Sequence, residues 1–451
     1  MRRRLLATTF ALGALLLSSA CSGSGDSTEE AATGPVTITV NGLPPDTDPV
    51  NRKNFEEDVT KFMDKYPDIK IEAKEGMMDP QTFSAKLAGG QLEDVFYVYF
   101  TDPQALIRKR QVSDISKYLG EFPNTKDLKP ELLRIFSDES GHAYGLPSQN
   151  YSMGLVYNRE LFKKAGLDPA TPPRTWAEVR EAAKKINALG GGVVGYGDYS
   201  KNNTGGWHFT AETYSLGGDV ATQDGETWKA AFNTATGKQV LQQLKDMRWT
   251  DNSMGQKQLL EYSDLLQMMG SNKLGMYLGT GSDIVNIVNQ YKGKFDTYGL
   301  GSIPDGKGTL GGGDGYMFKA GLSPAKIKAG LTWLSYKTVA PDRIAESLGR
   351  ANKNKEPVGL PQPNIWVAGS PSDKTLVAER DKLKNVPVEN FAPFAATETS
   401  IPLKLEPPLA QQVYAVLDVP MQKVLTDRNA DIDKLLADAE AQVNGVLGAA
   451  K

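Results

Sequence analysis

Strand-like and helix-like segments alternate along the first hundred residues, and this alternation constrains the fold more than any other feature of the chain. Residues 36–40 (VTITV) and 69–73 (IKIEA) predict strands, and apolar residues recur at helical spacing between Phe55 and Tyr66. Residues 95–100 (VFYVYF) form a nearly continuous apolar run, which is typical of a parallel strand covered on both faces. The sequence therefore predicts an α/β fold with at least one parallel sheet.

Two later segments predict amphipathic helices. Thr175 and Glu178 have the spacing of a capping box, in which hydroxyl and carboxylate each satisfy a backbone donor at a helix start. The apolar positions that follow end at Gly190–Gly192. Near the end of the chain, residues 432–447 carry apolar side chains at helical spacing and predict a second such helix.

Size and charge limit what the chain can be. The roughly 430 residues that follow the N-terminal leader exceed what one hydrophobic core supports, so we expect two lobes of about 150–250 residues each. The net charge of -3 and the lack of a basic cluster argue against a nucleic-acid partner. Only two histidines occur, which leaves little material for a His-based metal site or catalytic triad, and no cofactor is expected.

The N-terminus has the pattern of an export signal. Three arginines at 2–4 precede an apolar run at 5–17, which is shorter than the about 20 residues needed to span a bilayer. Small residues then lead to Cys21, the only cysteine. The segment resembles a bacterial lipoprotein signal. This resemblance implies a signal peptide at 1–20, lipidation with palmitate at Cys21 and a flexible tether at 21–34. An ordinary cleaved signal and a twin-arginine export route remain alternatives.

Several stretches of the chain resemble one family. They are residues 86–95 (KLAGGQLEDV), 144–147 (YGLP), 156–167 (VYNRELFKKAGL), 173–178 (PRTWAE), 301–304 (GSIP) and 311–313 (GGG). In this order they are similar to the extracellular solute-binding proteins of carbohydrate ABC importers (solute-binding family 1), the group that includes maltose-binding protein. The combination of Tyr-Gly-Leu-Pro with the later Thr-Trp is the specific part, and the glycine-rich pieces alone are weak.

The resemblance implies a two-lobed periplasmic-binding-protein-like fold of type II, with lobes joined by hinge crossovers near 145–149, 301–305 and 338–341. The N-terminal lobe would combine 35–147 with 304–337, and the C-terminal lobe would combine 148–303 with 338–451. The implied function is that of a monomeric, lipid-anchored binding protein on the extracytoplasmic face of the membrane. It would capture a sugar between the lobes and deliver it to permease subunits without chemical change.

A sugar site needs flat aromatic side chains for the C–H faces and polar groups for the hydroxyls, because a buried hydroxyl left unpaired costs about 1–3 kcal/mol. Loops that end strands or start helices supply the candidates. The predicted ligand-binding residues are Asn41, Tyr99, Asp102, Asn150, Tyr151, Trp207, Ser282, Asp283, Asp314, Tyr316 and Trp366. The glycines around Asp314 are expected to form a loop where backbone approaches a ligand closely.

Each candidate also has a structural interpretation. Asp283 could only cap a helix, Asp314 and Asn41 could only stabilise turns, and the aromatic residues could fill the core. The other four tryptophans, Trp176, Trp228, Trp249 and Trp333, are expected in the core.

Two other classes of function remain open. A secreted glycosidase would need two carboxylates about 5–10 Å apart, and no common hydrolase motif occurs in the sequence. A protein of the same fold could bind a peptide, a polyamine, a phosphate ester or a metal instead. The candidate loops hold neither the basic cluster that a phosphate ester favours nor a metal-ligand motif.

Overall fold

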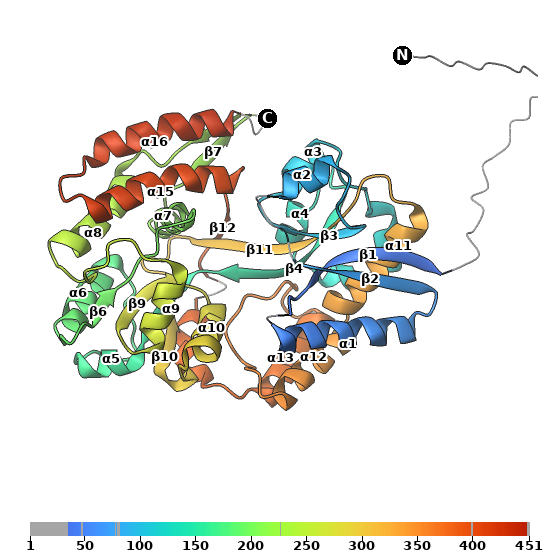
Figure 1. Cartoon of the computed structure of the whole chain (residues 1–451), viewed down its shortest axis with the longest axis horizontal. Helices are drawn as coiled ribbons and strands as arrows, with labels where there is room; N and C mark the ends of the chain where they lie inside the picture. The colour runs from blue at the N-terminus through green and yellow to red at the C-terminus, as the bar shows by residue number, and fades with distance from the viewer. Residues whose placement is uncertain are drawn as a thin grey trace, which may run out of the picture. The chain divides into compact units, whose positions relative to one another are not determined.

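The computed structural model describes residues 35–46, 48–76, 78, 82–225, 227–397 and 400–448. The predicted signal peptide, the tether and Cys21 lie outside these residues. The larger sheet has the strand order β12-β11-β3-β1-β2, and β4 also pairs with β11 (Figure 1). Its strands are β1 (Val36–Leu43), β2 (Ile69–Glu75), β3 (Val95–Tyr99), β4 (Gly145–Ser152), β11 (Thr309–Phe318) and β12 (Leu403–Leu405).

The predicted parallel sheet is confirmed in part. β1 pairs in parallel with β2 and with β3, as the apolar strand pattern suggests. β11 is antiparallel to β3 and to β4, so the sheet is mixed. The β4–β11 pairing extends from Gly145 opposite Met317 to Ser152 opposite Gly311. It joins segments that are more than 150 residues apart, which a local sequence pattern does not reveal.

The second sheet has the order β10-β5-β9-β6, and a separate hairpin pairs β7 with β8. These strands are β5 (Gly154–Asn158), β6 (Val194–Tyr196), β7 (Ala221–Asp224), β8 (Thr227–Ala230), β9 (Leu274–Gly279) and β10 (Tyr298–Gly301). All residues of β5, β6, β9 and β10 are buried, which is expected for strands covered on both faces.

The helices that precede β5 and the first three helices that follow β11 belong with the first sheet. They are α1 (Pro49–Lys65), α2 (Phe83–Ala88), α3 (Pro103–Arg108), α4 (Pro130–Ile135), α11 (Pro324–Leu334), α12 (Pro341–Lys353) and α13 (Pro371–Leu383), with 3₁₀ turns η1 (Ser116–Glu121) and η2 (Pro123–Asp127) and a π-helical turn η4 (Ser335–Val339).

The remaining helices lie between β5 and β10 or close to the C-terminus. They are α5 (Arg159–Lys164), α6 (Trp176–Asn187), α7 (Thr204–Ser215), α8 (Ala235–Trp249), α9 (Tyr262–Gly270), α10 (Gly281–Tyr291), α14 (Ala392–Ala395), α15 (Ala410–Thr426) and α16 (Ile432–Leu447), with 3₁₀ turns η3 (Phe295–Thr297) and η5 (Val388–Phe391). Figure 1 shows α15 and α16 beside α7 and α8, with which they pack. None of the helices among the described residues combines the length and apolarity needed to cross a membrane.

The buried apolar residues form separate cores for the two sheets. One core surrounds the first sheet, and two further clusters cover the second sheet. Trp333 and Trp176 are buried in these cores, as predicted. Trp228 and Trp249 are only half-buried, so their placement in the core was wrong. Trp228 packs at the edge of the second core, and Trp249 donates to the carbonyl of Val424 at 2.8 Å.

The capping box is confirmed. The amide of Glu178 donates to the Thr175 hydroxyl at 3.2 Å, and the amide of Thr175 donates to the Glu178 carboxylate at 3.2 Å. The helix that these contacts begin is α6, which buries Trp176 and Ile186 on its inner face.

Two predicted loops are regular structure instead. The polar segment that ends in Trp207 enters α7 at Thr204, so Trp207 is a helical residue. Gly206 lets α7 approach α15 closely, since a Cβ there would meet the Tyr414 carbonyl oxygen at 2.3 Å. The glycine-rich segment around Asp314 lies in the middle of β11 and is not a turn. In both places tertiary packing, rather than the local flexibility of glycine, determines the backbone conformation.

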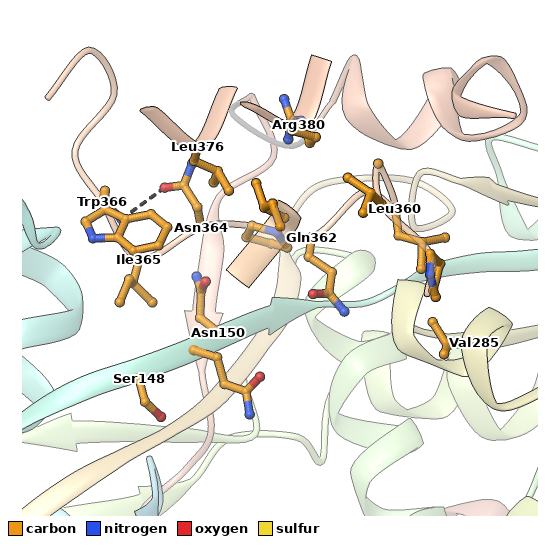
Figure 2. A pocket seen from close by; sticks show the side chains of 16 residues that line it. Ser148, Asn150, Val285, Leu360, Gln362, Asn364, Ile365, Trp366, Leu376 and Arg380 are labelled. Atoms are coloured by element: carbon orange, nitrogen blue, oxygen red, sulfur yellow. Dashed lines mark hydrogen bonds between the residues drawn. The ribbon is translucent and has the colours of Figure 1, made fainter. Parts of the chain in front are cut away.

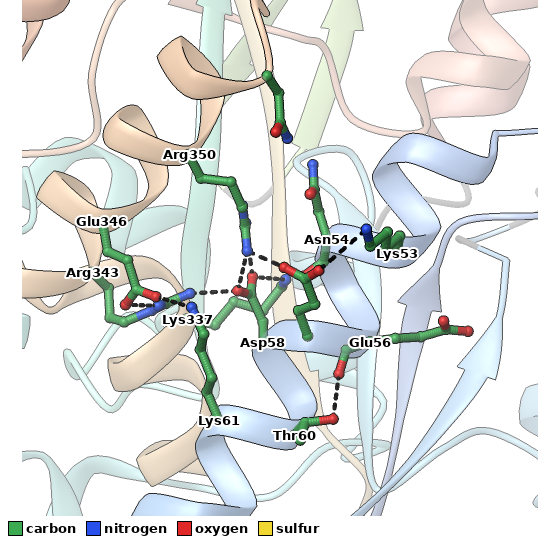
Figure 3. Close-up of polar contacts among 12 residues, drawn as sticks. Lys53, Asn54, Glu56, Asp58, Thr60, Lys61, Lys337, Arg343, Glu346 and Arg350 are labelled. Atoms are coloured by element: carbon green, nitrogen blue, oxygen red, sulfur yellow. Dashed lines mark hydrogen bonds and ion pairs between the residues drawn. The ribbon is translucent and has the colours of Figure 1, made fainter.

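A buried ion cluster fastens α12 to α1 (Figure 3). Asp58 is 5% exposed and accepts from Arg343 at 2.5 Å and from Arg350 at 2.6 Å. Lys337 lies 3.6 Å from the same carboxylate. Burial alone would raise the pKa of Asp58, but these three cations more than offset it and hold the pKa below its ordinary value.

Candidate functional site

Four aromatic rings lie in a continuous row next to the β4–β11 pair. Tyr151 on β4 meets Trp207 on α7 with ring centroids 6.2 Å apart. Trp207 meets Tyr199 at 6.3 Å, and Tyr199 meets Tyr262 on α9 at 5.5 Å. Tyr151 and Trp207 are half-buried, so part of each ring remains accessible. Exposed aromatic surface held in a fixed orientation is what the flat C–H face of a sugar requires.

The glycines of β11 make room for this row. Tyr151 lies opposite Gly312 in the β4–β11 register. A Cβ at Gly312 would come within 2.2 Å of the Tyr151 hydroxyl, so the ring lies directly on the glycine backbone. The glycine run therefore accommodates an aromatic side chain of the protein, a role that the sequence pattern did not indicate.

Two carboxyl groups, those of Glu406 and Asp314, lie close enough to Tyr151 for their charges to act on it. Burial, followed by the charges of Glu406 and Asp314, raises the pKa of the Tyr151 hydroxyl, and Tyr99 also contributes. Burial raises the pKa of Asp102 to about 6 and that of Glu406 to about 7, and the charge of Asp102 contributes to the shift at Glu406. We call Tyr99, Asp102, Tyr151, Trp207, Asp314 and Glu406 the aromatic–carboxylate site.

These carboxyl groups lack cationic partners. Within the described part of the chain, Asp102, Asp314 and Glu406 form no ion pair with lysine or arginine, and no cation contributes to their pKa shifts. Neutral donors hold them instead: Thr101 donates to Asp102 at 2.8 Å, and Tyr414 donates to Glu406 at 3.1 Å. Partly desolvated carboxylates without cations are strong acceptors for hydroxyl donors.

Of these three carboxyl groups, Asp314 accepts the most hydrogen bonds from the protein. The Tyr97 hydroxyl and the Gln149 amide each donate to it at 2.7 Å, and the Ser148 hydroxyl also contacts it. Burial raises the pKa of Asp314 although these donors lower it in part. The structure therefore brings Asp314 next to Tyr151 and Gln149, on the same face of the ribbon.

Two other predicted residues, Asn41 and Tyr316, contact Tyr97, the residue that donates to Asp314. Asn41 is buried, and its side-chain oxygen accepts from the Tyr97 amide at 2.7 Å. Tyr316 is buried against Tyr97, with ring centroids 5.7 Å apart. Asn41 and Tyr316 therefore position Tyr97, whose hydroxyl donates to Asp314.

Asp283 and Ser282 lie at the start of α10. Asp283 is buried and closes a capping box with Thr280, and it also accepts from Tyr262 at 2.8 Å and from Tyr277 at 3.2 Å. Both of its carboxylate oxygens are engaged by the protein, so the structural interpretation explains this residue. Ser282 is exposed, and its hydroxyl lies 2.8 Å from that of Thr280. A ligand contact of either residue stays a prediction.

The last two predicted residues, Asn150 and Trp366, line a cavity that Ser148 and Gln149, the partners of Asp314, also line. This cavity measures about 350 Å³ and lies between β4, α10, α13 and the segment 357–366 (Figure 2). Asn150 lies between Gln149 and Tyr151 on β4, and successive side chains of a strand point to opposite faces. Asn150 therefore points away from the aromatic–carboxylate site.

Sequence reasoning missed Glu406, Gln149 and Tyr199. Gln149 and Tyr199 lie in segments whose polar and aromatic composition is visible in the sequence. Glu406 carries no such signal, because it precedes two prolines and reaches the site through the pairing of β12 with β11. No group of three or more His, Cys, Asp or Glu residues suited to a metal ion occurs among the described residues.

The raised pKa of Glu406 predicts a pH-dependent stability. The folded protein keeps this proton up to about pH 7, whereas the unfolded chain loses it near 4.5. Glu406 therefore costs stability as the pH rises through this range. We expect Glu406→Gln to raise the free energy of unfolding by about 1 kcal/mol at pH 8, after allowance for solvent screening, and to change little at pH 4.

Urea unfolding at pH 4, 6 and 8 measures this difference. Glu131→Gln, at an exposed position on α4, is the matched control and should show no such trend. A Glu406→Gln variant that is less stable than the parent protein at pH 8 would contradict the proposed desolvation.

Comparison with known proteins decides the family. The family model described as bacterial extracellular solute-binding protein matches residues 48–335, which is more than half of the chain. The chain belongs to this family. The resemblance drawn from the sequence is confirmed, and with it the expectation of an extracellular binding protein rather than an enzyme.

Individual relatives agree on the fold. A cyclic α-maltosyl-1,6-maltose binding protein from Arthrobacter globiformis superposes with a TM-score of 0.69 at 22% identity, over 92% of this solute-binding protein and 99% of that chain. UgpB from Mycobacterium tuberculosis, solved with glycerophosphocholine, gives a TM-score of 0.71 at 15% identity, over 93% and 100%. The two-lobed, type II periplasmic-binding-protein fold is thereby confirmed, while the residue boundaries of the lobes stay a prediction.

Among curated sequences, the sn-glycerol-3-phosphate-binding periplasmic protein UgpB of Agrobacterium fabrum is 28% identical over 49% of this chain and 50% of its own length. The chain thus spans about half the length of the curated relatives that it matches. The names of these three relatives mention a cyclic maltosyl-maltose, glycerophosphocholine and sn-glycerol 3-phosphate. They differ in ligand class, so the ligand must be argued from this chain's own residues.

Proposed function

We propose that this solute-binding protein is the substrate-binding component of an ABC importer and captures a neutral sugar, oligosaccharide or polyol at the aromatic–carboxylate site. Tyr151 and Trp207 would stack on the C–H faces of the ligand. Asp102, Asp314 and Glu406 would accept hydrogen bonds from its hydroxyl groups. The lobes would close around the ligand without chemical change, as hinge proteins of this type do.

The observation that carries this proposal is the set of carboxyl groups without cationic partners beside half-buried aromatic rings. A phosphate ester brings at least one negative charge, which Asp102 and Glu406 would repel. It would also require convergent arginine and lysine donors or a helix N-terminus. A neutral polyhydroxy ligand brings no charge for these carboxyl groups to repel, and its hydroxyls are further donors for them.

Location and partners follow the same proposal. The segment 1–20 would direct export, and acylation of Cys21 would hold the protein at the outer face of the cell membrane through the tether 21–34. Membrane permease subunits would receive the ligand from the protein acting as a monomer.

A thermal-shift panel tests the ligand class. Maltose, larger oligosaccharides, monosaccharides and mannitol are compared with glycerol 3-phosphate and glycerophosphocholine. We expect at least one neutral ligand to stabilise the protein, by about 2.7 kcal/mol at one hundred times its dissociation constant. Glycerol 3-phosphate should give no shift at pH 8.

Asp102→Asn is the control for binding at this site and should reduce the shift. Stabilisation by glycerol phosphates alone would overturn the sugar assignment in favour of a phosphate ester. Turnover of an oligosaccharide during the incubation would indicate an enzyme.

A further inference from the structure

We propose that His208 is a positioning residue of the aromatic–carboxylate site, and that its bond to Asp198 fixes the plane in which Trp207 presents its ring to the ligand. The effect on ligand binding rests on the proposed function, whereas the effect on the Trp207 ring does not. His208 lies on α7 and is 2% exposed, so it is too deeply buried to contact a ligand. Its influence must therefore pass through the rings that it touches.

His208 contacts two rings of the aromatic row. Its imidazole stacks on the Trp207 ring, with centroids 5.3 Å apart and planes 28° from parallel. It also meets the Tyr199 ring edge-to-face, with centroids 4.2 Å apart and an interplanar angle of 82°. The rings of Trp207 and Tyr199 are 6.3 Å from each other. His208 thus lies closer to each of these two rings than they lie to one another, and it backs both of them.

Helix geometry alone does not produce the stacking of Trp207 on His208. The two residues are consecutive in α7, and consecutive side chains of an α-helix point about 100° apart and do not face each other. A contact from outside the helix must therefore orient one of the two rings. Trp207 is half-buried, so the better-held ring is that of His208.

Asp198, two residues after the end of β6, supplies this contact. Its carboxylate oxygen Oδ1 lies 2.6 Å from Nδ1 of His208. The other ring nitrogen, Nε2, is buried and has no hydrogen-bond partner among the described residues. The bond to Asp198 is thus the one polar contact in this part of the structure that selects the orientation of the His208 ring.

The chemistry of the Asp198–His208 pair favours a positioning role over simple packing. Asp198 is 1% exposed and forms no ion pair with lysine or arginine within the part of the chain that the structure describes. Its charge adds to the burial that raises the pKa of Glu212, one turn further along α7. A buried polar pair is often less favourable than apolar residues of similar volume. A hydrogen bond, however, selects a single ring orientation, which apolar contacts do less strictly.

The order of the Trp207 ring can be measured without any ligand. The six tryptophans give six indole ¹⁵N–¹H signals, and Trp207→Phe assigns the relevant one. The heteronuclear NOE of this signal reports motion of the ring on the picosecond to nanosecond timescale. We expect a value close to that of the α7 backbone in the parent protein and a clearly lower value in Asp198→Leu. Asp198→Asn should keep the parent value, because its side-chain oxygen still accepts from Nδ1.

His208→Gln is the second variant, chosen in case Asp198→Leu does not fold. Glutamine can donate to Asp198 but offers no ring for Trp207, so we expect the same loss of order. Asp251→Leu is the matched control, since the Asp251 side chain is 6% exposed and pairs with Arg180, away from the aromatic row. It should lower stability and leave the Trp207 signal unchanged. Equal loosening of Trp207 in this control would overturn the specific role of His208.

Calorimetric titration with the sugar that gives the largest thermal shift completes the test. We expect Asp198→Leu and His208→Gln to weaken binding about tenfold, and Asp198→Asn and Asp251→Leu to weaken it less than about twofold. An unchanged Trp207 NOE in the folded variants would overturn the positioning role, and lowered order with unchanged affinity would overturn its importance for the ligand. If the parent protein binds no sugar, the proposed function fails, while the NOE still decides whether His208 fixes the Trp207 ring.

Discussion

Replacing Trp207 with alanine is expected to weaken binding of the proposed sugar ligand by about 100-fold, which corresponds to about 2.7 kcal/mol. Trp207 presents its half-buried ring beside Tyr151, next to the three carboxyl groups that have no cationic partner. Removal of the ring deletes the stacking surface and lets water reach these groups. Calorimetric titration with the sugar that gives the largest thermal shift measures the loss.

Trp228→Ala is the matched control for this variant. Trp228 is also half-buried and packs against the same core, but it lies on β8, away from the aromatic row. We expect both variants to lose stability and only Trp207→Ala to lose affinity. Equal affinity of the two variants would show that Trp207 is a core residue and not a ligand contact.

Replacing Asp58 with alanine is expected to lower the free energy of unfolding by about 3–5 kcal/mol. The substitution leaves Arg343, Arg350 and Lys337 close together without their shared carboxylate. Asp58 also joins α1 to α12, which are nearly 300 residues apart in sequence. Its lowered pKa adds stability at neutral pH that is lost as the pH falls through the folded-state value.

Glu57→Ala on the same helix is the control. Its side chain is 42% exposed and its carboxylate lies 3.8 Å from Lys53, so its removal should change stability by less than about 0.5 kcal/mol. Denaturant unfolding of both variants at pH 7 measures the difference. Comparable stability of the two variants would mean that the three cations find other partners when Asp58 is absent.

The regular elements were largely predictable from local patterns. The strands that begin at Val36, Ile69 and Val95 occur where apolar periodicity places them. The capping box at Thr175 and the C-terminal helix at 432–447 also agree with the sequence. These signals are reliable because they depend on residues within one element, whose side chains select a backbone conformation and a buried face.

Glycine-rich segments were misread for a physical reason. A glycine shows that a Cβ would be unfavourable, but it does not show what occupies the space. At Gly312 the occupant is the Tyr151 ring, and at Gly206 it is the backbone of α15. Both neighbours come from distant parts of the sequence, so no local pattern identifies them.

The sequence by itself determined the α/β class and the kinds of aromatic and polar side chain available for a binding site. Only the tertiary structure decided which of these side chains meet. It placed Tyr151, Trp207, Asp102 and Glu406 together and directed Asn150 to the other face of the same strand. The reason is that strand pairing between remote segments fixes the register of β4 on β11, and the register fixes the face on which each side chain lies.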